Sequence, residues 1–208
     1  MKVVLCYGDS NTWGYDPATK KRFAPDVRWT GVTQAQLGDG YRVIEEGLNG
    51  RTTVWDDPIE GYKNGKEQII PCIESHKPID LVIIGLGVND LKQRFSVPAW
   101  DIAASAGKLV EIVQKSATGP DDSAPAVLLL CPAKVGKLSE FADMFGGAVE
   151  KSAQLADQYE RVAGEYDCPW FDIGAVATSS DLDGIHFEAG EHRKIGEAIA
   201  ARVKAILE

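Results

Sequence analysis

The sequence lacks a long apolar run, and it lacks cysteine pairs of the kind that form metal sites or disulfide frameworks. No stretch approaches the roughly 20 consecutive apolar residues that a transmembrane helix needs. The four cysteines lie far apart and form no C-x-x-C pair, so we expect free, mostly buried thiols in a reducing compartment: Cys6, Cys72, Cys131 and Cys168. These absences argue against a membrane protein and against a disulfide-rich secreted module.

Basic residues are outnumbered by acidic ones. The chain has 22 Lys and Arg against 31 Asp and Glu, which gives a formal net charge of −9 at pH 7. An acidic surface argues against nucleic acid and anionic membranes as partners. The first expected strand begins at Lys2 and the candidate nucleophile is Ser10, which leaves no room for a cleaved signal peptide, so we expect a cytoplasmic protein.

Five apolar runs of strand length alternate with amphipathic segments of helix length. The expected strands cover residues 3–6, 41–45, 80–86, 126–131 and 169–172, and the expected helices cover residues 29–37, 66–75, 98–115, 148–166 and 189–206. Strands that alternate with helices predict an α/β fold, in which a parallel sheet carries helices on both faces. With 208 residues, 44% of them hydrophobic, the chain is expected to form one domain over residues 1–208.

Residues that carry chemistry follow four of these strands. Ser10 follows the first strand, Gly50 the second and Asn89 the third, while Asp183 and His186 follow the last. In open parallel sheets, ligands bind outside the carboxyl ends of the strands. The four segments are therefore expected to meet at one edge of the sheet.

The residue types at these positions fit nucleophilic catalysis. A serine hydroxyl is a poor nucleophile unless a base takes its proton, and His186 is the candidate base for Ser10. Asp183, three residues earlier, can hold the other ring nitrogen of the histidine. Asn89 can offer an amide N–H to a developing oxyanion, and Gly50 and Ser10 can offer backbone N–H groups. The pattern predicts a triad with an oxyanion hole.

Two of these motifs also fit a purely structural role. Asp9 and Ser10 are both favoured helix caps, so taken alone the first motif fits a cap as well as a nucleophile. Asn89-Asp90 fits a plain turn, and within it Asp90 is expected to brace the loop rather than to react. The convergence of four separate segments favours catalysis.

Four blocks together resemble the SGNH-hydrolase superfamily, also called the GDSL esterases. They are Gly8-Asp9-Ser10, Gly50 within Gly-Leu-Asn-Gly-Arg-Thr-Thr, Gly87-Val88-Asn89-Asp90 and Asp183-Gly184-Ile185-His186, and they occur in this order across nearly the whole chain. The resemblance implies a flavodoxin-like three-layer α/β/α sandwich with a five-stranded parallel sheet. It implies a triad of Ser10, Asp183 and His186, an oxyanion hole of Ser10, Gly50 and Asn89, and no metal or organic cofactor.

Three further segments, residues 22–31, 43–48 and 51–53, are similar to the bacterial arylesterase and acyltransferase branch of that superfamily. This resemblance implies hydrolysis of small aryl or short-chain alkyl esters through an acyl-enzyme. It also implies acyl transfer to alcohols or peroxide as a second activity, and a homo-oligomer with a hydrophobic channel.

Four large side chains form the expected substrate-binding set. Phe141 and Phe145, spaced to share one face of a helix, match positions that line the channel in that branch. Trp13 lies on the same turn as the serine, and Ile185 directly precedes the histidine. Bulky apolar groups of this kind predict a narrow pocket that accepts a flat ring.

Two other classes of function stay open at this stage. A metal-dependent phosphoesterase could use Asp9, Asn89, Asp183 and His186 as ligands, but paired carboxylates and a second well-placed histidine are missing. His76 lies in a polar turn, and His192 lies among the charges of a helix face. A non-catalytic flavodoxin-like module could bind a phosphorylated ligand, although the glycine spacing fits neither the dinucleotide nor the P-loop pattern.

Overall fold

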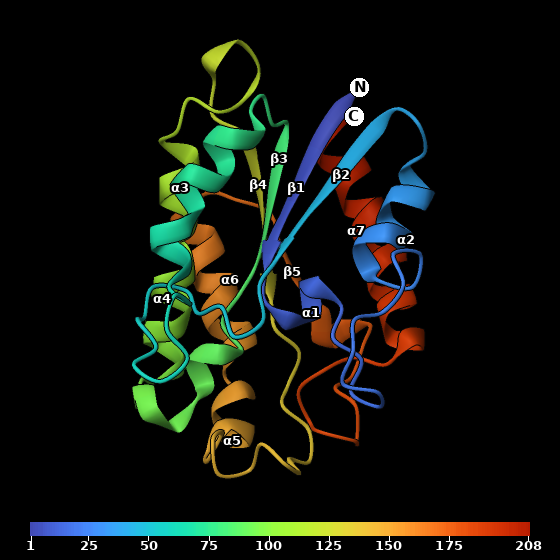
Figure 1. The fold of residues 1–208 in the computed structure, drawn as a ribbon. Coiled ribbons are helices and arrows are strands. Elements are labelled where there is room, and N and C mark those ends of the chain that lie inside the picture. The colour runs from blue at the N-terminus through green and yellow to red at the C-terminus, as the bar shows by residue number, and fades with distance from the viewer.

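The computed structural model describes residues 1–208, and a parallel sheet of five strands forms its centre (Figure 1). The strands are β1 (Lys2–Gly8), β2 (Tyr41–Gly47), β3 (Leu81–Gly85), β4 (Ala126–Cys131) and β5 (Trp170–Asp172). Their order in the sheet is β2-β1-β3-β4-β5. The chain runs from β1 outward to β2 and then back past β1 to β3, so the winding direction reverses at β1. This reversal creates the switch point at which open α/β sheets bind ligands.

Alternating side chains of the central strands fill two separate cores. In β1, Leu5 and Tyr7 point into one core, while Val4 and Cys6 point into the other. Residues 81–84 of β3 are all buried and divide in the same way. A strand that is apolar on both faces needs cover on both faces, which explains the layers of helices on either side.

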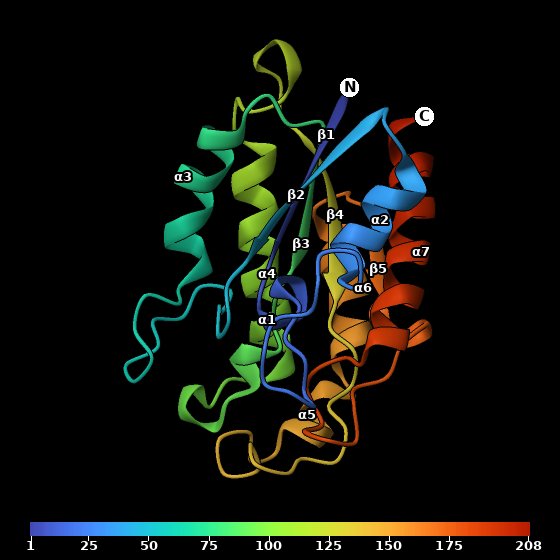
Figure 2. The ribbon, with the colours of Figure 1, turned by 45° about the vertical axis from the view of Figure 1, so that its right-hand side comes forward.

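Helices cover both faces of the sheet. In Figures 1 and 2, α3, α4 and α6 lie on one face, while α2 and α7 lie on the other. The helices are α1 (Ser10–Trp13), α2 (Trp29–Leu37), α3 (Gly65–His76), α4 (Ala99–Gln114), α5 (Ala148–Ser152), α6 (Leu155–Glu165) and α7 (Ala189–Leu207). The expected three-layer α/β/α fold with five parallel strands is confirmed.

The structure corrects two details of the expected helices. The single helix expected over residues 148–166 is two helices, α5 and α6, separated at residues 153–154. The Ser152 hydroxyl there accepts the backbone N–H of Val135, 2.9 Å away, and so ties the end of α5 to the loop after β4. The helix expected over residues 66–75 extends one residue further at each end as α3, and Pro71 lies inside it.

Four short 3-10 helices were not expected from the sequence. They are η1 (Asn89–Leu91), η2 (Gln93–Phe95), η3 (Pro120–Asp122) and η4 (Ile173–Ala175). None of the helices combines the length and the apolar character needed to cross a bilayer.

Candidate active site

Ser10 lies at the start of α1, directly beyond the carboxyl end of β1. The carboxylate of Asp9 caps this short helix by accepting the backbone N–H of Asn11, 2.9 Å away. Gly14 ends the helix in the left-handed conformation, with φ of 86°, which glycine adopts without strain. The sharp turn places the serine hydroxyl at the edge where the strands end.

A chain of hydrogen bonds joins Ser10, His186 and Asp183. His186 Nε2 lies 2.8 Å from Ser10 Oγ, and His186 Nδ1 lies 2.7 Å from Asp183 Oδ2. All three residues are buried. Because the carboxylate accepts the proton of Nδ1, Nε2 is left unprotonated and can accept the serine proton.

Asp183 is held in its ionised form. Its other oxygen, Oδ1, accepts the backbone N–H groups of Ile185 at 2.8 Å and His186 at 2.9 Å. Burial acts to raise the pKa of Asp183, but the hydrogen bonds from His186 and Ile185 outweigh it and bring the pKa below its ordinary value. The carboxylate is thus a fixed negative charge beside the imidazole.

Asn89 and Gly50 lie on the same cavity as the serine and the histidine. The amide Nδ2 of Asn89 donates to the backbone oxygen of Arg51 at 3.2 Å. An amide nitrogen carries two hydrogens, so one remains for a ligand. Gly50 has φ of 81°, and a side chain there would collide with the carboxylate of Glu60. The left-handed backbone therefore favours glycine at this position.

Buried contacts lock the two loops that carry Gly50 and Asn89 against each other. The carboxylate of Asp90 is fully buried and accepts both the backbone N–H and the hydroxyl of Thr53. The guanidinium of Arg51 donates to the backbone oxygen of Gly8, 2.8 Å away, at the end of β1. Asp90 braces the loop, as expected, and the residues of the expected oxyanion hole are tied to β1.

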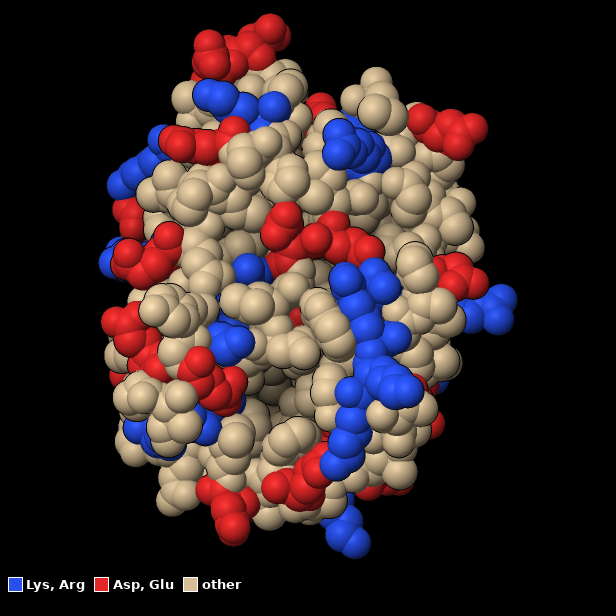
Figure 3. All heavy atoms as spheres, in the orientation of Figure 1, with Lys and Arg blue, Asp and Glu red and all other residues tan.

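The cavity over the serine has a volume of about 230 Å³. In the lower half of Figure 3, where the strands of Figure 1 end, the surface is hollowed, with a column of basic side chains along one side of the hollow. The lining combines apolar and aromatic side chains with polar and charged ones. The lining residues are Ser10, Tyr15, Asn49, Gly50, Glu60, Lys63, Asn89, Lys92, Phe141, Met144, Phe145, Ile185 and His186.

Three of the four expected substrate-binding residues line this cavity: Phe141, Phe145 and Ile185. Residues 141–147 form turns rather than the expected helix, but Phe145 N–H still bonds to the oxygen of Phe141, which keeps the two rings side by side. Trp13 lies outside the lining. The Arg22 guanidinium covers its ring at 5.1 Å, and Arg22 Nε donates to its backbone oxygen.

Sequence reasoning missed Tyr15 and the charged residues of the lining. The Tyr15 ring lies 4.2 Å from the ring of His186. Lys92 is almost fully buried, and its amine lies 2.5 Å from Glu60 Oε1 and 3.4 Å from Asp57 Oδ2. These ion pairs neutralise acids beside the cavity. Tyr15 and Lys92 lie in irregular loops, so their positions in the sequence follow no helix or strand pattern that could assign them to the cavity.

The carboxylates that a metal-dependent phosphoesterase would use are committed to other partners. Asp183 accepts three hydrogen bonds, and Asp9 accepts the capping N–H of Asn11. The two other histidines lie outside the cavity. His192 is fully buried on α7, where it accepts the backbone N–H of Trp29 and burial lowers its pKa to about 4.

Comparisons with known proteins show which family model and which solved structures resemble this chain. The model of the GDSL-like Lipase/Acylhydrolase family matches residues 6–194. The structure of an aryl esterase from M. smegmatis is 42% identical, with a TM-score of 0.96 and 100% of both chains covered. A carbohydrate acetylesterase from Sinorhizobium meliloti is 40% identical, with a TM-score of 0.96, and the match covers 99% of this chain and 100% of that one.

A more distant solved structure shares the fold alone. It is a member of the lipolytic G-D-S-L family from Veillonella parvula, 13% identical, with a TM-score of 0.70 and 99% of each chain covered. No match was found among curated proteins.

Proposed function

The chain belongs to the GDSL-like lipase/acylhydrolase family and is a carboxylic ester hydrolase, and from this we propose that it cleaves small esters with Ser10 as nucleophile, His186 as base and Asp183 as the orienting acid. The observation that carries the proposal is the chain of hydrogen bonds of 2.8 and 2.7 Å through the histidine. In this proposal residues 1–208 form one catalytic domain.

The first half of the reaction makes an acyl-enzyme. Ser10 Oγ attacks the ester carbonyl carbon while His186 Nε2 takes the hydroxyl proton. The carbonyl oxygen becomes an oxyanion beside Asn89 and Gly50, whose N–H groups stabilise the charge, together with the backbone N–H of Ser10. The tetrahedral intermediate collapses, the C–O bond to the alcohol breaks, and the imidazolium gives its proton to the leaving oxygen.

The second half releases the acid. A water molecule gives a proton to His186 Nε2 and attacks the acyl carbon, and the bond to Ser10 Oγ then breaks as the serine regains its proton. An alcohol or peroxide in place of this water leads to acyl transfer by the same steps. Asp183 stays ionised throughout and stabilises the imidazolium.

The cavity supports a small substrate. A volume of about 230 Å³ is below the range of roughly 300–1,000 Å³ typical of drug-sized ligands. The apolar side chains of Phe141, Phe145 and Ile185 suit a short acyl chain or an aryl group. The name of one similar esterase, a carbohydrate acetylesterase, is in keeping with a short acyl group, and the name of the other, an aryl esterase, is in keeping with an aryl ester.

The proposal also covers the cellular location of the protein and its assembly. A cytoplasmic location is supported by the four cysteines, which are all free. Assembly as a homo-oligomer is supported by Ile59 and Tyr62, which are 76% and 96% exposed on the loop that gives Glu60 and Lys63 to the cavity. Sedimentation analysis of the wild type against Tyr62→Ser tests this assembly.

Covalent labelling tests the proposed nucleophile. A serine-directed aryl phosphonate should inactivate the enzyme and attach to Ser10, as mapped by mass spectrometry of the digested chain. Excess chelator should leave both labelling and turnover unchanged. Attachment at another residue, or activity that is lost with chelator and restored by added metal, would reject the proposal.

A further inference from the structure

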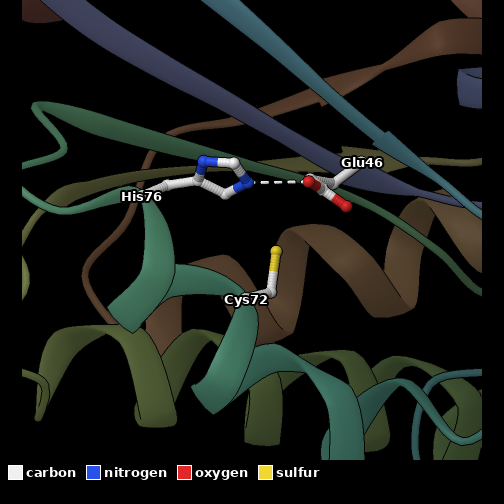
Figure 4. Close-up of side chains that lie close together, drawn as sticks. All are labelled: Glu46, Cys72 and His76. Carbon is white, nitrogen blue, oxygen red and sulfur yellow. Dashed lines mark hydrogen bonds and ion pairs between the residues drawn. The ribbon is translucent and has the colours of Figure 1, made fainter.

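Three side chains that can ligate a metal, Glu46, Cys72 and His76, meet at the edge of the sheet. Cys72 and His76 lie four residues apart on α3, so they share one face of the helix. Glu46 reaches them from the edge strand β2. Figure 4 shows the sulfur of Cys72 pointing toward the hydrogen bond that joins the other two side chains.

The geometry of this cluster is close to that of a metal site. One ligand atom from each residue lies within 4.8 Å of the other two, and His76 Nε2 lies 2.7 Å from Glu46 Oε1. A tetrahedral site with bonds of about 2.0–2.3 Å holds its ligand atoms roughly 3.3–3.8 Å apart. Small rotations of these half-buried side chains bring the three atoms to such distances.

The donor set selects the kind of cation. Imidazole nitrogen, thiolate sulfur and carboxylate oxygen are the ligands of zinc, whereas calcium and magnesium take oxygen ligands. Glu46 and an ionised Cys72 carry two negative charges, which neutralise a divalent cation. The side chains of His76 and Glu46 are 26% and 34% exposed, so solvent reaches the site and water can fill the fourth position.

We propose that Glu46, Cys72 and His76 form a binding site for a zinc-class divalent cation, separate from the esterase site.

Binding at this site exchanges a proton for the metal. The free thiol of Cys72 carries a proton, and only the thiolate binds a metal. The S–H bond therefore breaks on binding, the sulfur–metal bond forms, and the proton passes to the buffer. His76 gives up its hydrogen bond to Glu46, and the proton on Nε2 moves through solvent to Nδ1, which leaves the lone pair of Nε2 free to bind the metal. Both side chains then become ligands. The metal then links β2 to the last turn of α3.

Cobalt(II) provides the direct test, since its absorption spectrum reports both the ligands and the geometry. Titration of the wild type should give one cobalt per chain, with a thiolate-to-cobalt charge-transfer band and the strong visible bands of tetrahedral cobalt, and zinc should displace the cobalt. A weak octahedral spectrum without a thiolate band would overturn the proposal. This measurement needs no variant, so it stands even if a substituted chain fails to fold.

Variants identify the ligands by calorimetric zinc titration. Cys72→Ser, His76→Ala and Glu46→Gln should each weaken zinc binding at least about 10-fold, since the loss even of a residue that only orients a ligand costs 10–100-fold. Cys168→Ser is the matched control, because Cys168 is also a half-buried free thiol but belongs to no such cluster. His186→Ala should also keep its affinity. Unchanged binding in Cys72→Ser, or binding lost only in His186→Ala, would contradict the proposal.

Discussion

The ring of Tyr15 lies against the imidazole of His186, with the centroids 4.2 Å apart and the planes tilted by 36°. Phe141 approaches the same imidazole edge to face, at 6.0 Å and 67°. Both ring nitrogens of His186 are held by hydrogen bonds. The base is therefore fixed in position by contacts on its ring as well as at its nitrogens.

Removing the Tyr15 ring should impair the base without removing it. Tyr15→Ala lets the imidazole shift away from Ser10, and a misplacement of about 1 Å can cost about 10²-fold in rate. We expect a fall in kcat of about 10-fold to 100-fold, larger than the change in KM, for p-nitrophenyl acetate. Tyr15→Phe keeps the ring and should keep kcat near the wild-type value. Wild-type kcat in Tyr15→Ala would show that the contact positions nothing.

Asn89→Ala should slow turnover and leave KM nearly unchanged. The amide matters most once the ester oxygen carries the negative charge of the tetrahedral intermediate, so its loss raises the barrier more than it weakens substrate binding. The loss of one such donor costs roughly 10²–10³ in kcat, or about 3–4 kcal/mol. Steady-state kinetics checks this, with circular dichroism as the control for folding. A change of tenfold or less would limit Asn89 to its hydrogen bond with the oxygen of Arg51.

Asp90 should make the protein more stable in mild acid. Burial raises its pKa to about 7 from an ordinary value of 3.8, despite the hydrogen bonds from Thr53. The folded state then binds the proton more readily than the unfolded state, so this contribution is complete below pH 3.8 and is lost as the pH rises through 7. Each unit of difference in pKa corresponds to about 1.4 kcal/mol.

Asp90→Asn removes this ionisation and keeps an oxygen that can accept from Thr53. Urea unfolding across that pH range should show that the variant loses less stability than the wild type as the pH rises. Asp9, whose pKa burial raises to about 6, acts in the same direction in both proteins, and its charge also raises the pKa of Asp90. Identical profiles for the two proteins would contradict the account of Asp90.

The enzyme should prefer short acyl chains, from acetate to butyrate. Each methylene that fits the cavity adds about 0.8 kcal/mol of burial, and the first that clashes reverses the trend. Specificity constants for p-nitrophenyl esters from acetate to laurate measure this profile. A maximum at octanoate or beyond would point to a wide groove.

Phe141 is the better residue with which to enlarge this cavity. Phe145 is only 3% exposed and belongs to the core, so its truncation would cost about 3–5 kcal/mol of stability. Phe141→Ala should move the optimum to longer acyl chains, whereas Trp13→Ala, outside the lining, should leave it in place. An unmoved optimum in Phe141→Ala would place the acyl group against another wall.

The sequence was sufficient to predict the sheet and the gathering of the candidate triad. Strands such as Leu81–Gly85 are apolar on both faces, which few other structures permit. Once the strands are parallel, their carboxyl ends share one edge, so Ser10, Asn89 and His186 had to approach one another. The roles of these residues stay predictions, but their proximity follows from topology.

Loop geometry could not be predicted in the same way. Tyr15 and Lys92 reach the cavity because of hydrogen bonds and ion pairs within irregular segments, which leave no periodic pattern. Trp13 was expected in the cavity because it is near Ser10 in sequence, yet Arg22 covers its ring. The break between α5 and α6 likewise coincides with a hydrogen bond from a distant residue, Val135.

The central claim is that Ser10 and His186 act as one unit, and kcat for the two single variants and the double variant tests it most directly. Ser10→Ala and His186→Ala should each lose roughly 10⁶-fold in kcat, which leaves about 10³–10⁴ over the reaction in water. The double variant should lose no more than either single variant. A wild-type rate in either single variant, or a double variant whose loss is the product of the two, would contradict the account.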